Sequence, residues 1–436
     1  MRHARWRQFS RGTCNCDAER LPYNVAPILR PLKKRSGHAA ADTNGVPFFN
    51  LPSEDGDAPS CGVRGSVTLR IVINGRFLSQ QTTGVQRMAR EFTVALDRLL
   101  EDGYYPDLSV ELLVQAGVCL AALNLRVIRV TTIGLAKGHV WEQAILPWHR
   151  GADWLLNLGN TAPLISLYRG EAVAVVVHDL SHRLFPSAYR LAYRLAHRVL
   201  GHAIMARAKL VITVSETERD TITRLYPRAK RKIAVAQNGG ASDDAVTLPV
   251  RSSDPAASPY GLYVGSLSRR KNIDVVLKVA VDLARERNLQ FKLVGAFSPI
   301  LRETTLDVPS DVAGKIEFCG QIESKTELAS LYRNASFLLF PSLYEASALP
   351  PIEAMTYECP VIASNIAALR ERCGNAAIYC DPHDVEHIKA VAIKLLDEPT
   401  FSGEMIARGR DWAKRFSWRG QVRDVMTELL KRSTAK

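Results

Sequence analysis

Two glutamates near the C-terminus lie eight residues apart, at a place where carboxylates can hold a ligand. Glu345 and Glu353 belong to the segment PSLYEASALPPIEAM, which begins at Pro341. The apolar residues before it predict a short strand over 336–340, and the prolines at 350 and 351 suit the first turn of a helix. Glu345 then lies in the loop at the carboxyl end of a strand, where open α/β sheets bind ligands.

Such a site can bind hydroxyl groups at one end and an anion at the other. Carboxylates accept hydrogen bonds from sugar or ribose hydroxyls, while a helix N-terminus offers unpaired N–H groups and a partial positive charge to an anion. Two isolated glutamates are more often solvated surface charges. The residues around Glu345 and Glu353 are therefore needed to tell whether this pair is exposed on the surface or belongs to a binding site.

A basic loop nearer the N-terminus supports the interpretation of these glutamates as part of a binding site. Tyr260–Val264 is a short apolar run, followed by a loop that ends in Arg269, Arg270 and Lys271, and then by apolar residues at helical spacing. Three cations at the start of a helix oppose the helix dipole, so a bound anion explains them economically. The alternative is an ordinary solvated basic loop.

The glutamate segment, read on through Ser364, resembles the nucleotide-sugar site of the retaining glycosyltransferases called family 4 or group 1. That family usually has P-S-x-x-E-G-F-G-L-P-x-x-E-A-M-A-x-G-x-P-V-I-A-S. The residues that stand where the family has them are Glu345, Pro350, Glu353, Ala354, Met355, Pro360, Val361, Ile362, Ala363 and Ser364. Ala346, Ala348 and Glu358 occupy glycine positions, and Ser347 replaces the usual Phe. Because glycine reaches positive φ, these replacements predict an altered loop geometry.

The resemblance implies a role for each donor-site residue. Lys271 and Arg270, which match the family's R-K-N, would hold the donor diphosphate. Glu345 would orient the sugar, and Glu353 would bind the ribose. The other residues expected to line the donor are Ser266, Ala346, Ser347, Ala348 and Leu349.

The N-terminal half repeats the pattern of strand, loop and helix. Val67–Asn74 predicts a strand, 75–83 a polar loop, and Gly84 opens a helix through Leu100. This resembles the family's first strand and its D-G-R and G-I-x-R loop, with Asn74 in place of the Asp. The resemblance makes Asn74 and Gly84 residues of the acceptor-side loop.

Two further strand ends carry polar residues. The apolar strand Val173–Val177 ends in His178-Asp179-Leu180, which resembles the family's H-D-L and implies that His178 is a catalytic-site residue near the donor sugar. The strand over 209–214 leads into Ser215 and Glu218, whose spacing predicts a capping box.

The chain has room for two domains. It has 436 residues, of which 47% are apolar. We expect a basic extension over 1–66 without a packed core, a Rossmann-like acceptor-side domain over 67–245, and a nucleotide-sugar domain over 246–415. The polar stretch Ala241–Pro259 reads as the linker. The helical pattern of Trp412–Lys431 predicts a terminal helix. The resemblance implies that the chain from residue 416 onward crosses back to the first domain. The expected fold is α/β of the GT-B type, two Rossmann-like domains with parallel sheets facing an interdomain cleft.

Composition narrows the class of protein. No apolar run reaches the roughly 18 residues of a membrane span, and the first 30 residues lack the apolar core of a signal peptide, so a cytoplasmic enzyme is expected. The eight cysteines show no paired C-x2-C spacing and are expected to be reduced and mostly buried. The net charge is +13, and the first 35 residues contribute 9 − 2 = +7 of it. No nucleic-acid motif accompanies these cations, so no nucleic-acid partner is expected.

The reaction that the resemblance implies is transfer of a hexose from a nucleotide diphosphate sugar to a hydroxyl, with retention at the anomeric carbon. The acceptor would be a glycan or a polyprenyl-linked saccharide. GDP-mannose is the preferred donor, because the H-D-L and R-K-N residues resemble bacterial mannosyltransferases of surface-polysaccharide assembly. Neither a cofactor nor a metal is expected, since the chain has no D-x-D in a suitable loop. The alternatives are a GT-B nucleotide-sugar epimerase and a noncatalytic partner subunit with a degenerate donor loop.

A basic amphipathic helix is expected over 187–209. Arg190, Arg194 and Arg198 recur every four residues beside an apolar stripe that contains Leu191 and Leu195. Such a helix can pack on its sheet with a solvated basic face. It can also hold anionic lipid head groups, which would place the enzyme peripherally on the inner face of the cell membrane.

Overall fold

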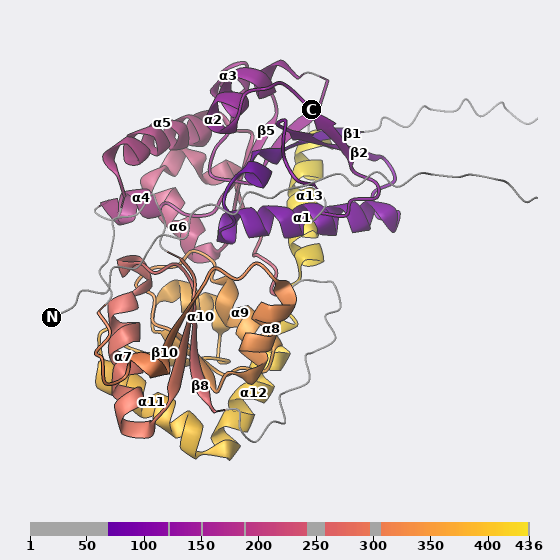
Figure 1. Ribbon diagram of the computed structural model, residues 1–436. Helices are drawn as coiled ribbons and strands as arrows, with labels where there is room; N and C mark the ends of the chain where they lie inside the picture. The colour runs from indigo at the N-terminus through magenta and orange to yellow at the C-terminus, as the bar shows by residue number, and fades with distance from the viewer. Residues whose placement is uncertain are drawn as a thin grey trace, which may run out of the picture. The chain divides into compact units, whose positions relative to one another are not determined.

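The computed structural model of the protein describes residues 69–120, 123–149, 151–186, 189–241, 258–296 and 307–434. The basic extension expected over 1–66 lies outside these ranges, as does most of the expected linker. The described residues form two halves, each built on one sheet of parallel strands with helices around it (Figure 1). The predicted α/β class with two parallel sheets is confirmed.

The first half has a sheet in the order β3-β2-β1-β4-β5-β6-β7. Its strands are β1 (Leu69–Asn74), β2 (Leu108–Val114), β3 (Arg129–Thr132), β4 (Trp154–Asn157), β5 (Val173–Val177), β6 (Leu210–Thr213) and β7 (Ile233–Val235). The central strands are short runs of Val, Ile and Leu that are buried on both faces, as parallel strands require.

The helices of the first half lie between these strands. The α-helices are α1 (Gly84–Glu101), α2 (Gly138–Val140), α3 (Leu164–Tyr168), α4 (Ser181–Leu184), α5 (Leu191–Arg207) and α6 (Glu216–Leu225). The 3-10 and π turns are η1 (Gly75–Ser79), η2 (Trp141–Ile145), η3 (Leu146–Trp148) and η5 (Pro227–Lys232). The polar loop predicted after β1 therefore begins as a helical turn, η1, which Asn74 caps.

The second half has a sheet in the order β10-β9-β8-β11-β12-β13. Its strands are β8 (Tyr260–Val264), β9 (Gln290–Val294), β10 (Ile316–Gly320), β11 (Phe337–Phe340), β12 (Val361–Ser364) and β13 (Ile378–Cys380). Its helices are η6 (Arg269–Lys271), α7 (Ile273–Arg287), η7 (Ala313–Lys315), α8 (Lys325–Asn334), α9 (Leu349–Thr356), α10 (Ala367–Cys373), α11 (Val385–Asp397) and α12 (Pro399–Ala413).

Each sheet reverses its strand order once. In the first sheet the reversal lies between β1 and β4, and in the second it lies between β8 and β11. Loops that follow the two strands at such a point diverge and leave room for a ligand. The loops after β8 and β11 carry the basic residues and the glutamates singled out in the sequence.

The C-terminal helix α13 (Trp418–Thr434) runs back to the first half and packs on α1 (Figure 1). Trp418 is 1% exposed and belongs to the hydrophobic core of the first half, and Trp154 of β4 donates from Nε1 to Ser433 Oγ at 2.7 Å. The predicted single helix over 412–431 is wrong at its start. Trp412 belongs to α12, and the chain turns between Ala413 and Trp418 before the terminal helix begins.

A carboxylate also joins the halves. Glu371 of α10 accepts the backbone N–H groups of Glu216 and Thr217, at 2.7 and 2.8 Å, together with the Thr217 hydroxyl at 2.6 Å and Gln237 Nε2 at 3.0 Å. It thus caps the N-terminus of α6 from the other half of the molecule. A charge-assisted cap of this kind satisfies orphan N–H groups and complements the helix dipole.

Within the described ranges, no helix is both long enough and apolar enough to cross a membrane. The cysteines of these ranges are all free. Cys359, Cys373 and Cys380 are buried, whereas Cys119 is exposed.

Candidate functional site

The basic loop after β8 is built to hold its cations in one place. Gly295, at the end of β9, lies so close that an added Cβ would be 1.8 Å from the carbonyl oxygen of Gly265, so only glycine fits there. Ser266 Oγ lies 3.2 Å from Ser268 Oγ, and the Ser266 carbonyl accepts the Tyr263 hydroxyl at 2.8 Å. The loop then closes into η6, which consists of the three cations.

Asn272 ends η6 in the left-handed conformation, with φ 59°, which asparagine tolerates better than most residues. Its side-chain amide donates to the carbonyls of Pro341 and Pro382, at 3.1 and 2.6 Å. The Leu343 N–H also donates to the Arg270 carbonyl at 3.0 Å. The basic loop is therefore fastened to the loop that follows β11.

Lys271 and Glu345 meet across these two loops. The Lys271 ammonium donates to Glu345 Oε1, and the two side chains are 13% and 6% exposed. Burial lowers the pKa of the Lys271 ammonium, while the carboxylate of Glu345 opposes that shift. The two charges that the resemblance assigns to the diphosphate and the sugar thus neutralise each other in this structure.

Arg270 lies deeper. Its Nη1 donates to the Tyr344 carbonyl at 3.2 Å, and its Nε is buried without a hydrogen-bond partner among the described residues. Burial by itself would lower the pKa of the guanidinium, but Glu345 and Asp179 raise it, so the group stays charged. A buried cation with an unused donor is suited to an anionic ligand.

The loop after β11 runs through Ala346, Ser347 and Ala348 into α9, where Leu349 is the first helical residue. Ala346, Ala348 and Leu349 are buried, so they can offer a ligand little beyond their backbone groups. Ser347 Oγ is buried and has no hydrogen-bond partner within the described ranges. Prolines at 350 and 351 occupy the first turn of α9, as predicted.

Ala348, at one of the positions where the family has glycine, has φ −72°. Among the described non-glycine residues, those with positive φ are Asn124, Asn272, Asn288 and Glu358, so Ala346 is not among them either. The one former glycine position that needs positive φ is Glu358, with φ 60°. Ion pairs with Arg333 and Arg410 engage its carboxylate.

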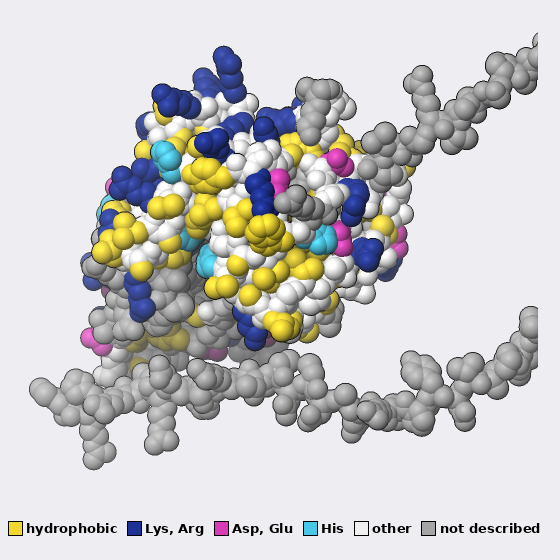
Figure 2. All heavy atoms as spheres, turned by 90° about the horizontal axis from the view of Figure 1, so that it is seen from above, with side chains coloured by type: hydrophobic (Ala, Val, Ile, Leu, Met, Phe, Trp, Pro, Cys, Tyr) yellow, Lys and Arg dark blue, Asp and Glu magenta, His cyan; other side chains and the backbone are white. Residues whose placement is uncertain are grey.

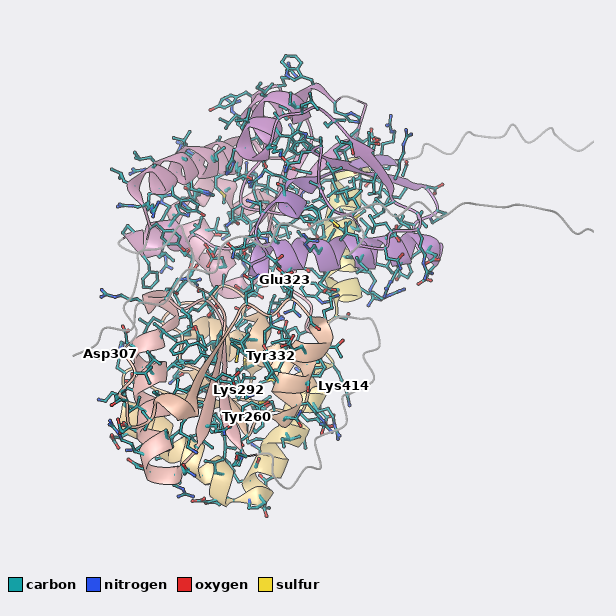
Figure 3. The ribbon with its side chains drawn as sticks, viewed as in Figure 1. Tyr260, Lys292, Asp307, Glu323, Tyr332 and Lys414 are labelled. Carbon is teal, nitrogen blue, oxygen red and sulfur yellow. The ribbon has the colours of Figure 1, made fainter. Side chains whose placement is uncertain are left out.

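Glu353 is 1% exposed and lies on α9 behind the loop. Tyr332 of α8, labelled in Figure 3, donates its hydroxyl to Glu353 Oε2 at 3.0 Å. Arg87 from α1 of the first half pairs with Glu353 Oε1 at 2.8 Å. Oε2 therefore accepts a hydrogen bond, whereas Oε1 makes an ion pair with Arg87 but accepts no hydrogen bond among the described residues. A ribose would have to share this carboxylate with Arg87.

The first half places its polar residues at the carboxyl edge of its own sheet. Asn74 donates from Nδ2 to Glu142 Oε1 at 2.8 Å and to Asn157 Oδ1 at 2.9 Å, and its own Oδ1 accepts the Arg76 N–H. Asn74 is 5% exposed, so its hydrogen-bonding groups serve the protein itself. An added Cβ at Gly84 would meet nothing within 4 Å, which leaves open space beside this helix start.

His178 follows β5 and is buried. Its Nε2 lies 3.0 Å from the Leu158 carbonyl, so that nitrogen carries the proton and Nδ1 is an acceptor. Burial lowers the pKa of the imidazole, which keeps it neutral at pH 7. A neutral imidazole whose Nδ1 is an acceptor can receive a hydrogen bond from a sugar hydroxyl.

Comparisons with known proteins show the family of this chain. Residues 258–398 match the family model described as Glycosyl transferases group 1. The chain is 31% identical over 262 residues to O-antigen chain mannosyltransferase B of Escherichia coli, an alignment that covers 58% of this chain and 68% of that protein. The chain belongs to the group 1 glycosyltransferases. A second relative of this family is the O-antigen chain mannosyltransferase RfbU of Salmonella typhimurium, which is 28% identical over 284 residues, or 63% of this chain and 76% of that one.

Solved structures show the fold of this group 1 glycosyltransferase. Sucrose-phosphate synthase from Thermosynechococcus elongatus aligns with a TM-score of 0.64 and 19% identity, over 84% of this chain and 100% of that one. WaaG, a glycosyltransferase involved in lipopolysaccharide biosynthesis, aligns with a TM-score of 0.58 and 14% identity, over 82% and 98%. The predicted GT-B fold is confirmed.

Three residues that contact the site were not predicted as site residues from the sequence. Arg87 pairs with Glu353, Tyr344 carries the carbonyl that Arg270 binds, and Glu218 accepts the Tyr344 hydroxyl at 2.8 Å. Arg87 stands at the arginine of the family's G-I-x-R loop, which begins at Gly84, so the family pattern could have pointed to Arg87. Nothing in the spacing of Glu218 and Tyr344, which are 126 residues apart, pointed to their contact.

Proposed function

We propose that the protein transfers a hexose from a nucleotide diphosphate sugar to a hydroxyl of a glycan or lipid-linked saccharide. The observation that carries the proposal lies at the point where the second sheet reverses its strand order. There Lys271, after β8, pairs with Glu345, after β11, and Arg270 donates to the carbonyl of the neighbouring Tyr344. Cations and a carboxylate at that edge suit the two ends of a nucleotide sugar.

In this reaction the bond between the anomeric carbon and the phosphate oxygen breaks, and a bond to the acceptor oxygen forms on the same face of the sugar. The acceptor proton passes to the departing phosphate oxygen, so no protein nucleophile is needed. Lys271 and Arg270 would neutralise the charge that develops on the nucleoside diphosphate, and Glu345 would hold sugar hydroxyls once the diphosphate has taken its place beside Lys271. Because these cations can balance the diphosphate, we propose that the reaction needs no metal.

The proposed donor is GDP-mannose. Its support is the names of the relatives, since both the Escherichia coli and the Salmonella typhimurium protein are O-antigen chain mannosyltransferases. The proposed acceptor is a growing surface polysaccharide on its lipid carrier.

A panel of nucleotide sugars tests the function. Purified protein is incubated with GDP-mannose, UDP-glucose and related donors, with and without a mannose-terminated acceptor, and the anomeric configuration of any product is determined by NMR. Acceptor-dependent release of GDP with an α-linked product, unaffected by EDTA, is expected. An epimerised sugar nucleotide formed without acceptor would establish the epimerase instead, and no binding of any donor would establish a noncatalytic subunit.

We propose also that the first half docks on anionic membrane, and α5 carries the main support. Leu191, Leu195 and Val199 project from one side of this helix and are 64%, 55% and 62% exposed. Arg190 and Arg198 beside them are exposed as well. An apolar stripe packed on the sheet would be buried, so this stripe is free for another partner. Residues 187 and 188 of the predicted segment lie outside the described ranges.

The same surface continues beyond α5. Arg207 of α5 stacks over the ring of Tyr168 in α3 at 5.3 Å, and Arg169 stacks over Trp148 in η3 at 4.2 Å. Tyr168 and Trp148 are 64% and 59% exposed. The end-on view of the first half shows Lys and Arg side chains around hydrophobic ones, with few Asp or Glu (Figure 2). Exposed aromatic and apolar groups bordered by cations suit a lipid head-group layer.

Cosedimentation with vesicles tests the docking. A chain that begins at residue 67 removes the basic extension, which could bind vesicles by itself. Binding to vesicles with anionic lipid, but not to neutral ones, is expected, because each cation contributes about 1 kcal/mol near an anionic surface. Salt and the triple change of Arg190, Arg194 and Arg198 to Gln should weaken it. Failure to bind anionic vesicles at low salt would refute the docking.

A further inference from the structure

Glu218 departs from the role that its position predicts. In a capping box, Ser215 Oγ would accept the Glu218 N–H and the Glu218 carboxylate would return to the Ser215 N–H. The first bond is present at 3.1 Å, but the carboxylate points elsewhere. Its Oε1 accepts the Leu180 N–H at 3.0 Å, and its Oε2 accepts the Tyr344 hydroxyl at 2.8 Å. The capping-box prediction is therefore wrong for the carboxylate.

These two bonds reach two different loops of the candidate site. Leu180 directly follows His178 and Asp179 in the first half, and Tyr344 directly precedes Glu345 in the second. One carboxyl group, 1% exposed, thus ties the loop after β5 to the loop after β11.

Tyr344 is held from three sides. Its hydroxyl meets Glu218, its carbonyl accepts Arg270 Nη1 at 3.2 Å, and its ring lies 5.5 Å from the ring of Phe185. A shift of Tyr344 would move both Glu345, its chain neighbour, and Arg270, its hydrogen-bond partner. The Tyr344 side chain is therefore one of the contacts that place the donor-side groups relative to the first half.

We propose that Glu218 is a positioning residue for sugar transfer, which acts through Tyr344 to align the donor-side groups with His178 and Asp179. The ionised carboxylate performs this role best, because both of its partners are donors and a charge-assisted hydrogen bond is roughly twice as strong as a neutral one. The inference rests on the proposed function, since it assumes that Arg270 and Glu345 face the donor.

The surroundings of Glu218 make its ionisation sensitive to pH. Burial, together with the nearby Asp179 carboxylate, raises the pKa of Glu218 to about 7, against the lowering effect of the bonds from Tyr344 and Leu180. Arg270 lies on the far side of Tyr344, and Glu371 of α10 caps the start of the same helix α6. The link therefore changes its charge close to neutral pH.

Transfer kinetics at saturating donor supply the first test. In the wild type, kcat should rise as pH increases through about 7. Glu218→Gln keeps a neutral link at every pH, so its kcat should lack this rise and lie about 3- to 10-fold below the wild type at pH 8. Tyr344→Phe breaks the link and should lower kcat at all pH values. The Kd for the free nucleoside diphosphate should stay within about twofold in both variants, since Arg270 and Lys271 remain.

The second test needs no activity. The folded protein keeps the Glu218 proton up to about pH 7, whereas an unfolded glutamate releases it near 4.5, so this group lowers the free energy of unfolding as pH rises between those values. Glu218→Gln should abolish this dependence and be the more stable protein above pH 7.

Two controls match the variants. Glu216→Gln changes an exposed carboxylate of the same helix, which pairs with Arg219. Tyr260→Phe removes a phenol that donates to the Leu331 carbonyl at 2.7 Å, away from the two loops (Figure 3). Both should keep the wild-type pH profile.

The outcomes separate the two proposals. If the wild type binds no nucleotide sugar, the proposed function fails, and the positioning role fails with it. If the wild type transfers sugar but Glu218→Gln and Tyr344→Phe keep its kcat and its pH profile, the function stands and the positioning role is overturned. Loss of the pH-dependent stability without any kinetic change would likewise leave Glu218 as a structural carboxyl only.

Discussion

The carboxyl edges of the two sheets use the same residue types in different ways. At the edge of the first sheet, Glu142 Oε1 accepts Asn74 Nδ2 and the Thr161 hydroxyl, each at 2.8 Å, and pairs with Arg76 Nε at 3.1 Å. At the edge of the second sheet, Arg270 Nε and Ser347 Oγ are buried without a partner among the residues that the structure describes.

The comparison shows what each edge can do. The network around Glu142 balances the charge of this carboxylate within the protein, although Arg76 Nε makes an ion pair without a hydrogen bond among the described residues, and it holds the loops of the first half in place. The second edge keeps unused donors and a pair of opposite charges, Lys271 and Glu345, that a diphosphate can separate. A carboxylate whose charge is balanced within the protein favours a fixed structure, whereas unused donors beside an ion pair that can be separated favour an anionic ligand.

The largest expected effect is at the second edge. Lys271→Ala should lower transfer on the order of 100- to 1,000-fold, because in the proposed reaction it removes a charge that would stabilise the leaving diphosphate in a desolvated site. Isothermal titration should show weaker nucleoside diphosphate binding as well. Lys278→Ala, an exposed lysine on the following helix α7, is the matched control and should behave as wild type. Equal activity of both variants would remove Lys271 from the site.

At the carboxyl edge of the first sheet, a change of Glu142 should affect the free energy of unfolding. Burial alone would raise the pKa of Glu142, but the hydrogen bond from His139 and the charge of Arg76, with Thr161 and Asn74, lower it to about 2. Relative to 4.5 in the unfolded chain, this contributes about 3 kcal/mol above pH 4.5, and the contribution is lost as pH falls toward 2.

Glu142→Gln should therefore lower the free energy of unfolding by about 3 kcal/mol at pH 7 and by less at low pH. Chemical denaturation at several pH values measures this change. The same loss at every pH would mean that the carboxylate charge is not what stabilises the first edge.

Glu345→Ala tests whether this carboxylate contacts the sugar while the cations bind the diphosphate. Loss of a hydrogen bond between a carboxylate and the sugar costs about 2 kcal/mol, so transfer should fall roughly 30-fold. Binding of free nucleoside diphosphate should persist, since the cations remain and Lys271 is released from its pair. Weakened diphosphate binding with unchanged turnover would contradict the sugar-side role.

The smallest effect is expected from restoring glycines. Ala348 has negative φ and Ala346 is not among the described residues with positive φ, so the double change to Gly relieves no strain there and costs about 0.5–1 kcal/mol per residue in unfolded-state entropy. Turnover should not rise. A large gain in kcat would show that these side chains obstruct the donor after all.

Local sequence was enough for several of the elements and for part of the site. Short apolar runs such as Tyr260–Val264 and Val173–Val177 match β8 and β5 residue for residue, because strands buried on both faces need unbroken apolar sequence. The prolines at 350 and 351 and the turn residues around them marked the start of α9. Lys271 and Glu345, 74 residues apart, were brought into one site only through the family resemblance, and the structure places them in contact.

Tertiary structure alone decided the partners. Ser215 and Glu218 have the spacing of a capping box, yet the Glu218 carboxylate reaches Leu180 and Tyr344, because a buried carboxylate takes the donors that packing brings to it. In the same way Glu353, on a helix of the second half, meets Arg87 from the first. Backbone periodicity and local propensity are encoded within a few neighbouring residues, so the sequence determined the strands, the helices and the loops that carry charge. Contacts between residues more than a hundred positions apart depend on how the two halves pack, and no local pattern specifies them.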